Sequence, residues 1–284
     1  MKTRSLACAA LMVCAIFLLS AYARAAGFRI VIMQDDKGAA EKYRPLLTYL
    51  QKKGVDVSLV GAPNYTTAAK MFAAGEADAM FSGSGVAGTL IIKGLAVPSV
   101  RPESAEGYST YWADIIAPKG SAKFTGSAGY FSGKKVILTA LASSGEFYYY
   151  SIPKIRDVNA HVMIAASHGA ALDVLARGVA DVAIVKDRIW DKKAGEYPGL
   201  EKVGEDKGEN PDSTLMVSTK ADPKTSGEIS AALLSIKGDT SAEARAAKEK
   251  LGIQGFIKTT KADFRHTLPL LKRAGVTKSF DFKY

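Results

Sequence analysis

Hydroxyl and imidazole side chains stand where this sequence predicts two loops that each lead into a helix. Ser143 and Ser144 precede the first of these helices, and His168 follows the capping residue Ser167 at the start of the second. Backbone N–H groups at the start of a helix favour an anion, and hydroxyl groups add further donors. These residues therefore predict a site for a small anion. A plain helix cap is the alternative for either serine, and a solvated ring is the alternative for His168.

The sequence lacks the motifs of common catalytic and nucleotide-binding sites. Its three histidines show no metal-ligand spacing, and it contains no phosphate-binding loop, dinucleotide-binding glycine motif or nucleophile elbow. Gly83-Ser84-Gly85 is too short to be any of these, although its backbone could approach a ligand closely. No pair of carboxylates is arranged for acid–base catalysis. We therefore expect no catalytic residue, no metal, no cofactor and no enzymatic activity.

Residues 1–25 have the pattern of an export signal. Lys2 and Arg4 precede an apolar run, and Ala23-Arg24-Ala25 fits a small-x-small cleavage site. The apolar run is shorter than the ~20 residues that a membrane-spanning helix needs. A membrane anchor and a lipid attached at Cys14 are the weaker alternatives. We expect cleavage near Ala25 and a periplasmic protein without a thiol, since both cysteines lie in this segment.

The composition is that of an ordinary globular protein. The 284 residues are 48% hydrophobic and 23% charged, so the chain can bury a sizeable core. The formal charge is +10 and would fall to +7 on loss of the export signal. Because the basic residues are spread along the chain without a dense tract, we expect no nucleic-acid binding. A mild positive field would still attract an anion.

Strand and helix patterns predict a βαβαβ unit that occurs twice. The alternating strands and helices of the first unit fall over residues 28–34, 40–54, 55–61, 65–75 and 77–83. Those of the second unit fall over residues 134–140, 146–158, 160–166, 168–178 and 179–186. This order implies in each unit a parallel sheet that is covered by helices.

The second helix and third strand of the two units align without gaps at an offset of 103 residues. Gly75-Glu76-Ala77-Asp78 matches residues 178–181, and Tyr65 matches His168. Chance similarity between two alanine-rich helices is the alternative. The match places two hydrogen-bonding rings at equivalent helix starts, facing each other across a cleft. Asp187 takes the place in the second unit that the Ser84 loop takes in the first.

Two such units predict a two-lobed protein with its ligand beyond the carboxyl ends of the strands. After the export signal, we assign residues 26–111 and 213–284 to lobe one and 112–212 to lobe two. The chain crosses between lobes over residues 108–118 and 212–220, which predicts a hinge. Residues 192–213 are polar and rich in turn-forming residues, which predicts a surface loop. The alanine-rich tail, residues 223–251 and 261–274, reads as helical.

This arrangement resembles the phosphate-, phosphite- and phosphonate-binding components of ABC importers, a branch of the type II periplasmic binding proteins. The resemblance covers most of the chain after the export signal. It is carried by Asn64-Tyr65, Gly75-Glu76-Ala77-Asp78, Tyr111, Ser143-Ser144-Gly145, Ser167-His168, Ala180-Asp181 and residues 255–275. It implies an α/β fold of two lobes, each a mainly parallel sheet flanked by helices, joined by a two-segment hinge.

The resemblance also implies which residues bind the ligand. The oxyanion would be held by Ser143, Ser144, His168, Tyr65 and Tyr111. Acidic residues would hold the amine of an aminophosphonate, and Asp187 and Asp212 are the nearest matches. Ser84 is a further candidate because it follows the third strand of lobe one.

The sequence departs from the family pattern at three places. Ala142 stands where the family loop carries an extra hydroxyl, and Ser84-Gly85-Val86 replaces a proline and an aromatic residue. Glu146 lies directly after the serine loop, and its carboxylate would repel an anion if it pointed inward. These changes bear on the identity of the ligand more than on the fold.

We therefore expect a monomeric periplasmic solute-binding protein of an ABC importer. It would bind a small oxyanion such as phosphate, phosphite or a phosphonate between its lobes and deliver it to an inner-membrane ABC permease. One alternative is a periplasmic ligand-sensing module for a signalling receptor, with a sensor protein as its partner. Another is a binding protein for a different small organic ligand, and an enzyme on the same scaffold is a third.

Overall fold

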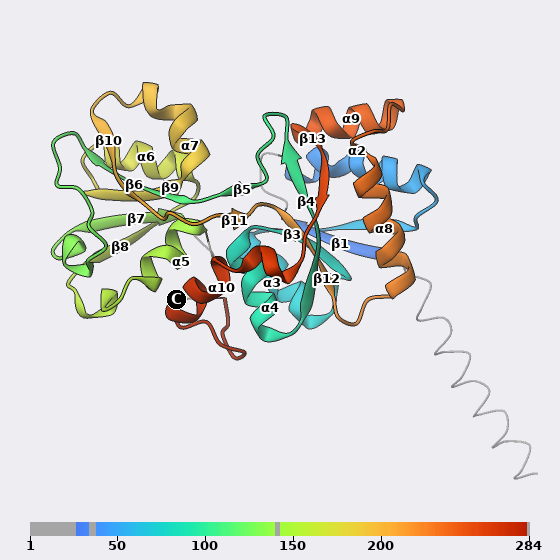
Figure 1. Ribbon diagram of the computed structural model, residues 1–284, viewed down its shortest axis with the longest axis horizontal. Helices are drawn as coiled ribbons and strands as arrows, with labels where there is room; N and C mark the ends of the chain where they lie inside the picture. The colour runs from blue at the N-terminus through green and yellow to red at the C-terminus, as the bar shows by residue number, and fades with distance from the viewer. Residues whose placement is uncertain (1–26, 34–37, 140–142, 283–284) are drawn as a thin grey trace, which may run out of the picture.

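The structure, a computed structural model, describes residues 27–33, 38–139 and 143–282 and has two α/β lobes (Figure 1). The export signal expected over residues 1–25, with its cleavage site and both cysteines, lies outside the described residues. So does Ala142. In the part of the chain that is described, none of the helices is long and apolar enough to cross a lipid bilayer.

The first lobe is built on a six-stranded sheet. In spatial order its strands are β13 (Ile253–Lys258), β4 (Ala96–Ser104), β12 (Thr214–Ser218), β3 (Ala79–Ser82), β1 (Phe28–Met33) and β2 (Val57–Ala62). The strands β1, β2 and β3 of the first βαβαβ unit run parallel. The remaining strands pair antiparallel.

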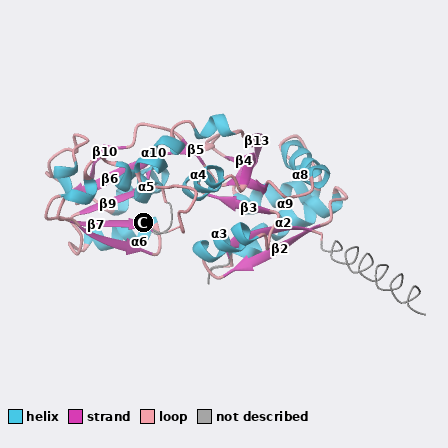
Figure 2. Ribbon diagram, turned by 90° about the horizontal axis from the view of Figure 1, so that it is seen from below, coloured by secondary structure: helices cyan, strands magenta, loops and turns pink. Residues whose placement is uncertain are grey.

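Helices cover both faces of this sheet (Figure 2). One face carries α2 (Ala39–Lys52), α8 (Pro223–Ser235) and α9 (Ala242–Leu251), and the other carries α3 (Tyr65–Ala74) and α4 (Ser84–Lys93). Side chains alternate across a strand, so Ile30 and Ile32 of β1 pack under the first set while Val31 packs under the second. The sheet is thus buried on both faces, which explains the continuous apolar run in β1.

The second lobe is built on a five-stranded sheet. In spatial order its strands are β10 (Leu200–Glu205), β6 (Ala113–Pro118), β9 (Val182–Lys186), β7 (Lys135–Thr139) and β8 (His161–Ala165). One face carries α5 (Ser144–Ser151) with 3-10 turns at Ala128–Phe131 and Ile155–Asp157. The other carries α6 (His168–Ala176) and α7 (Asp187–Lys193), followed by a 3-10 turn at Ala194–Glu196.

The expected fold class is confirmed, with one difference in the sheets. Only the three strands of each βαβαβ unit pair parallel with one another, and the other pairings described in the two large sheets are antiparallel. Both sheets are therefore mixed. β6 and β12 follow the segments that cross between the lobes, and an antiparallel neighbour needs no helical crossover, whereas a parallel one does.

The expectation that residues 192–213 form a surface loop is wrong. Residues 200–205 form β10, an edge strand that pairs antiparallel with β6. Only Leu200 and Val203 of this strand are buried, and its other side chains are mostly charged. Charged residues are typical of an edge strand because they discourage pairing with another chain. They also hide the apolar alternation by which a strand is recognised in a sequence.

Two chain segments pair with each other where they cross between the lobes. β5 (Thr110–Tyr111) and β11 (Asn210–Pro211) form a short antiparallel ribbon between the two large sheets (Figure 1). Asp212 follows β11, and its N–H donates to the Ser109 carbonyl at 3.1 Å. This ribbon is the hinge of the two-lobed fold.

The C-terminal part adds a third connection between the lobes. After a 3-10 turn at Lys261–Phe264, helix α10 (Thr267–Arg273) lies between α4 and α5 (Figure 1). Leu270 and Leu271 of α10 pack with Phe147 of α5, and a Cβ atom on Gly88 of α4 would collide with Leu271. The contact with α4 therefore requires a residue without a side chain at position 88.

Candidate functional site

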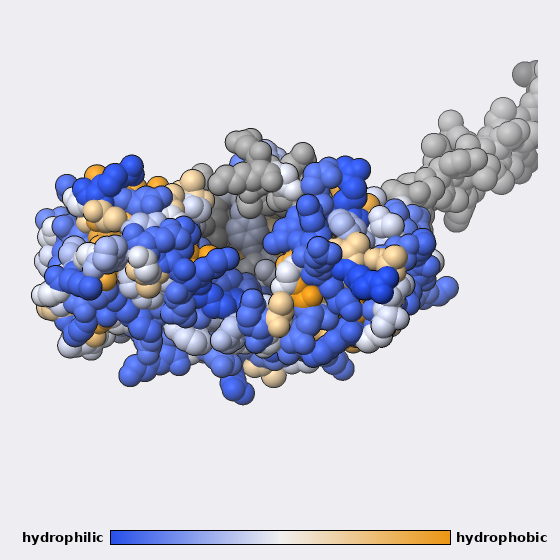
Figure 3. Space-filling model, turned by 90° about the horizontal axis from the view of Figure 1, so that it is seen from above, coloured by the Kyte–Doolittle hydropathy of each residue, from blue (hydrophilic) through white to orange (hydrophobic). Residues whose placement is uncertain are grey.

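A cleft separates the lobes, and the starts of five helices meet there. In Figure 3 the surface is hollowed between the two lobes. Helices α3, α4, α5, α6 and α7 each follow the carboxyl end of a parallel strand, and these ends face the cleft. The residues that sequence analysis selected lie at these helix starts or on the hinge segments: Tyr65, Ser84, Ser143, Ser144, His168 and Asp187 at the starts, Tyr111 and Asp212 on the hinge.

Two buried tyrosines stand on the lobe-one side of the cleft. The Tyr65 hydroxyl accepts a hydrogen bond from the Gly83 N–H. The Tyr111 hydroxyl lies 2.5 Å from Ser84 Oγ and also accepts from the Ser84 N–H at 3.3 Å. Burial raises the pKa of both tyrosines above the ordinary value, so both phenols are neutral. The Tyr65 hydroxyl therefore keeps its own proton for a further acceptor.

His168, at the start of α6 in lobe two, is a neutral ring. The Lys186 N–H donates to its Nδ1 at 3.3 Å, and Thr139 Oγ1 lies 3.1 Å from the same atom. Burial and the nearby Lys186 charge lower the pKa of His168 to about 4, against an opposing effect of Asp212. Because Nδ1 accepts a hydrogen bond from a backbone donor, the ring proton resides on Nε2. His168 is thus a neutral donor.

The two serines that precede α5 have different roles. Ser143 Oγ donates to the Thr139 carbonyl at 2.6 Å and accepts from the Glu146 N–H at 3.2 Å, so its hydroxyl caps the helix. Ser144 Oγ is buried and has no hydrogen-bond partner within the described residues. The helix start can lie against β9 because residue 145 is glycine; a Cβ atom there would be 2.5 Å from the Ile184 carbonyl oxygen.

Both acidic candidates already have partners. Asp187 is 3% exposed, and its carboxylate accepts from the Trp112 N–H at 3.2 Å. Burial raises the pKa of Asp187. Asp212 forms ion pairs with Lys186, at 2.8 Å, and with Arg188. Burial works to raise the pKa of Asp212, but these two cations outweigh it and the pKa lies below its ordinary range.

Sequence reasoning missed three residues of this cleft. Lys186 and Arg188 pair with Asp212, and both directly flank Asp187, which had been selected. Tyr43 of α2 stacks on Phe81, and burial together with the Asp212 charge raises the pKa of Tyr43 to about 12. The two cations could have been found as neighbours of a selected residue. No pattern in the neighbouring sequence marks Tyr43 as a residue of the site, since it lies one turn inside an ordinary amphipathic helix.

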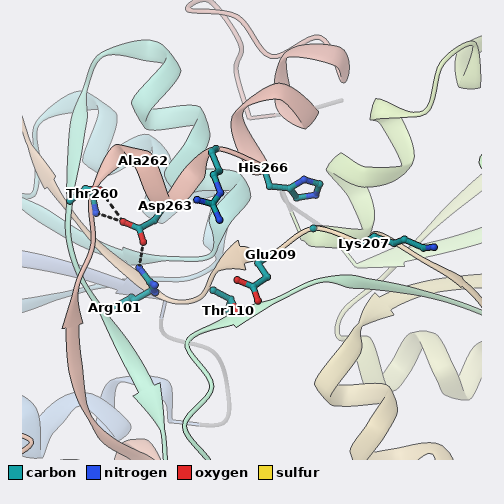
Figure 4. A pocket seen from close by; sticks show the side chains of 10 residues that line it. Arg101, Thr110, Lys207, Glu209, Thr260, Ala262, Asp263 and His266 are labelled. Carbon is teal, nitrogen blue, oxygen red and sulfur yellow. Dashed lines mark hydrogen bonds and ion pairs between the residues drawn. The ribbon is translucent and has the colours of Figure 1, made fainter.

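A separate cavity of about 690 Å³ lies beside the hinge (Figure 4). Thr110 lines it, whereas the next residue, Tyr111, contacts Ser84; successive side chains of a strand point to opposite faces. Two of its ionisable groups are paired: His266 contacts Asp206, and Figure 4 shows Arg101 pointing toward Asp263, at 3.0 Å. This cavity contains none of the residues that sequence analysis selected, so the inter-lobe cleft remains the candidate site.

No metal site is found among the described residues of the cleft. Across the described ranges, no group of three or more histidine, cysteine, aspartate or glutamate side chains is arranged to hold a metal ion. The chemistry available in the cleft is hydrogen bonding from hydroxyl, imidazole and amide donors, together with one group of ion pairs.

Comparison with known proteins identifies the fold and the family. Among solved structures, XAC2383 from Xanthomonas citri bound to chloride ion matches with a TM-score of 0.71 at 17% identity, over 87% of this chain and 97% of that one. PhnD1 from Prochlorococcus marinus in complex with methylphosphonate matches with a TM-score of 0.68 at 12% identity, over 87% and 98%. At these identities the likeness establishes the fold alone, that of a two-lobed type II periplasmic binding protein. Curated protein sequences gave no match.

A family model matches residues 28–264, which is most of the chain. The model describes the ABC transporter, phosphonate, periplasmic substrate-binding protein. This is a family of transport binding proteins, not of enzymes, that act in the periplasm with the permease components of ABC transporters. The expectation drawn from the order of the sequence motifs is thereby confirmed at the level of the family. This chain belongs to the periplasmic phosphonate-binding proteins of ABC transporters.

Proposed function

We propose that this protein holds the tetrahedral oxyanion of a phosphonate, phosphate or phosphite between its lobes and presents it to an ABC permease. The observation that carries the choice of site is Ser144. Its side chain is 1% exposed, and its hydroxyl lacks a hydrogen-bond partner among the residues described. A buried hydroxyl without a partner is costly, and an oxyanion at the start of α5 would supply the missing acceptor.

Neutral donors surround this position. The first N–H groups of a helix have no partner within the helix, and α5 begins at Ser144. His168 Nε2 and the Tyr65 hydroxyl add donors from the two sides of the cleft. Residues 143–151 contain no lysine or arginine. Neutral donors hold a buried anion when they are numerous and fixed, because each replaces a water lost from the anion. Such a site selects an oxyanion by its geometry.

The donors come from both lobes, so the ligand would join them. Tyr65 starts α3 in lobe one, whereas Ser144 and His168 start helices in lobe two. An oxyanion that accepts from all three would favour the closed arrangement. A permease can then distinguish the loaded protein from the empty one by the relative position of the lobes.

The test is calorimetry and thermal unfolding of the protein without residues 1–25, with methylphosphonate, phosphate, phosphite and sulfate as ligands. A ligand that binds only the folded chain raises the unfolding temperature. We expect Ser144→Ala to weaken binding by about 10- to 150-fold, the effect of one hydrogen bond to a charged group. Wild-type affinity in this variant would remove Ser144 from the site.

The matched control is the neighbouring serine. Ser143→Ala removes a helix cap and should lower the free energy of unfolding by about 1 kcal/mol. We expect its ligand affinity to stay within about threefold of the wild type, since the Ser143 hydroxyl already donates to the Thr139 carbonyl. Equal losses of affinity in both variants would mean that the loop as a whole, and not Ser144, governs binding.

Export and assembly are part of the same proposal. We propose that the chain is cleaved near Ala25 and acts as a monomer that does not bind nucleic acid. N-terminal sequencing of the periplasmic protein tests the cleavage site, and light scattering tests the oligomeric state. A mature N-terminus far from residue 26, or a stable dimer, would contradict these two points.

A further inference from the structure

We infer that the cleft selects oxyanions whose substituent carries a second negative charge and disfavours those whose substituent carries an ammonium group. The inference concerns the ion-pair cluster formed by Lys186, Asp212 and Arg188, at the end of the cleft next to the hinge. It rests on the proposed function, because it assigns the part of the same cleft that would hold the substituent of the bound oxyanion.

The cluster lies beside the residues proposed to hold the oxyanion. The Lys186 ammonium group is 4.4 Å from the centre of the Tyr111 ring, and the backbone N–H of Lys186 donates to His168. Arg188 lies within 6.0 Å of the Tyr108 ring. Asp212 immediately follows the hinge strand β11. The cluster therefore borders the position proposed for the oxyanion, where a substituent on the ligand would lie.

Two cations share a single carboxylate oxygen in this cluster. Lys186 and Arg188 both contact Oδ2 of Asp212, the lysine at 2.8 Å. All three side chains are largely buried, with exposed fractions of 21%, 23% and 18% for Lys186, Arg188 and Asp212. Charges in such a place are screened less than charges on the surface. The affinity for a ligand group beside them therefore depends strongly on the sign of that group's charge.

The cluster leaves no carboxylate ready for an amine. Asp212 is held by two cations, and Asp187, which accepts from the Trp112 N–H, is only 3% exposed. An ammonium group on the ligand would have to displace Lys186 or Arg188 from Asp212. The displaced cation would then be left partly buried without its partner, which is strongly unfavourable. The site therefore opposes a cationic substituent.

Arg188 has a donor left for an anionic substituent. Its Nε is buried and has no hydrogen-bond acceptor among the residues that the structure describes. A guanidinium group presents five N–H donors in a planar fork that matches a carboxylate, and the interaction recorded here uses only one terminal nitrogen. A carboxylate or second phosphonate on the ligand would satisfy the unused donors. A phosphonate that carries a carboxylate is thus the class of ligand that fits best.

The experiment compares three ligands of similar size by calorimetry: methylphosphonate, phosphonoacetate and 2-aminoethylphosphonate. We expect phosphonoacetate to bind at least about tenfold more tightly than methylphosphonate, the effect of one added charge-assisted contact. We expect 2-aminoethylphosphonate to bind at least about tenfold more weakly than methylphosphonate, because it meets two cations. Tighter binding of 2-aminoethylphosphonate than of methylphosphonate would overturn the inference.

Variants of the cluster identify its role. In Arg188→Gln, the advantage of phosphonoacetate should shrink to about threefold or less, while methylphosphonate affinity stays within about threefold of the wild type. Retained methylphosphonate binding also shows that the variant is folded. Lys192→Gln removes the same charge from an exposed position on the same helix and should change neither affinity. An unchanged preference in Arg188→Gln would overturn the assignment of that residue.

A double variant reverses the charge preference. Lys186→Gln together with Arg188→Gln frees the Asp212 carboxylate, so 2-aminoethylphosphonate should gain about tenfold in affinity relative to methylphosphonate. The experiments distinguish failure of the proposed function from failure of the charge selection. If no oxyanion binds the wild type, the proposed function fails. If methylphosphonate binds and the three ligands do not differ, only the charge selection fails.

Discussion

The hydroxyl of Tyr65 and Nδ1 of His168 each accept a hydrogen bond from a backbone N–H group 18 residues further along the chain. The donors are Gly83 and Lys186, which correspond to each other at the same 103-residue offset as the two rings. Each ring starts a helix and is fixed by the residue that precedes the next helix. The two units therefore share the geometry of a ligand-facing position as well as the order of their elements.

A second pair of contacts supports the same repeat. The Asp78 carboxylate accepts from the Arg29 N–H at 2.9 Å, and the Asp181 carboxylate accepts from the Lys135 N–H at 2.7 Å. In each unit the contact joins the residue before the third strand to the first strand. The repeat is thus built into hydrogen bonds that are far from the cleft, so chance similarity of two alanine-rich helices does not account for it.

The equivalence of the two rings gives a test. We expect Tyr65→Phe and His168→Ala each to lower the affinity for methylphosphonate by about 10- to 150-fold, because each removes one hydrogen bond to a charged ligand. Tyr108→Phe is the control, since Tyr108 is 57% exposed, and it should bind as the wild type does. Calorimetry measures all three. Unchanged affinity in both cleft variants would remove the rings from the site.

His168 should make the stability of the fold depend on pH. Its pKa is about 4 in the folded chain, against an ordinary value of 6.5. Between pH 6.5 and 4 the unfolded chain binds a proton here that the folded chain does not, so the free energy of unfolding falls as the pH falls. The contribution is fully present above pH 6.5 and amounts to about 3 kcal/mol. Urea unfolding at several pH values measures it.

The difference between wild type and His168→Asn isolates this effect. Asp114 works in the opposite direction, because burial raises its pKa to about 6 and the folded chain then holds the extra proton. Comparing the two proteins at each pH removes the contribution of Asp114, which they share. We expect the wild type to lose more stability than His168→Asn as the pH falls from 6.5 to 4. Parallel curves would show that His168 is not buried in its neutral form.

The contact between α4 and α10 should depend on Gly88. In Gly88→Ala the new methyl group collides with Leu271, so we expect a loss of about 1–3 kcal/mol in the free energy of unfolding. Gly227→Ala is the matched control, because Gly227 is an exposed residue in the interior of α8 and a Cβ atom there would meet open space. That variant should gain about 0.5–1 kcal/mol from reduced backbone freedom in the unfolded chain. Similar effects of both substitutions would contradict the packing described here.

Ligand binding should bring the lobes together about the hinge ribbon. The donors proposed for the ligand come from both lobes, and β5 and β11 form the ribbon between the sheets. We expect the radius of gyration from small-angle X-ray scattering to decrease at saturating methylphosphonate. Ser144→Ala at the same ligand concentration, chosen below its weakened dissociation constant, should stay in the unliganded form. Absence of any contraction in the saturated wild type would exclude closure.

The sequence by itself determined the elements whose hydrogen bonds are local. Asn64 and Ser167 cap α3 and α6, and each side chain accepts from the N–H three residues later. Gly75 ends α3 in the left-handed conformation, which glycine adopts without a steric penalty. Periodicity and caps involve residues close in the chain, so the pattern of types already contains the interaction. The two βαβαβ units followed from these signals, and the family was indicated by a resemblance in the order of the motifs.

Tertiary structure decided how the side chains of the cleft are used. Asp212 was selected to hold the amine of an aminophosphonate, yet it is paired with Lys186 and Arg188, which lie 26 and 24 residues away. Ser143 and Ser144 are alike in type and adjacent in sequence, and only the fold makes one a cap and leaves the other buried without a partner. The balance of charges and hydrogen-bond donors in the cleft is set by which distant groups the hinge and the helix starts bring into contact. Residue types and spacing fix the candidates, whereas burial and pairing across the lobes fix their chemistry.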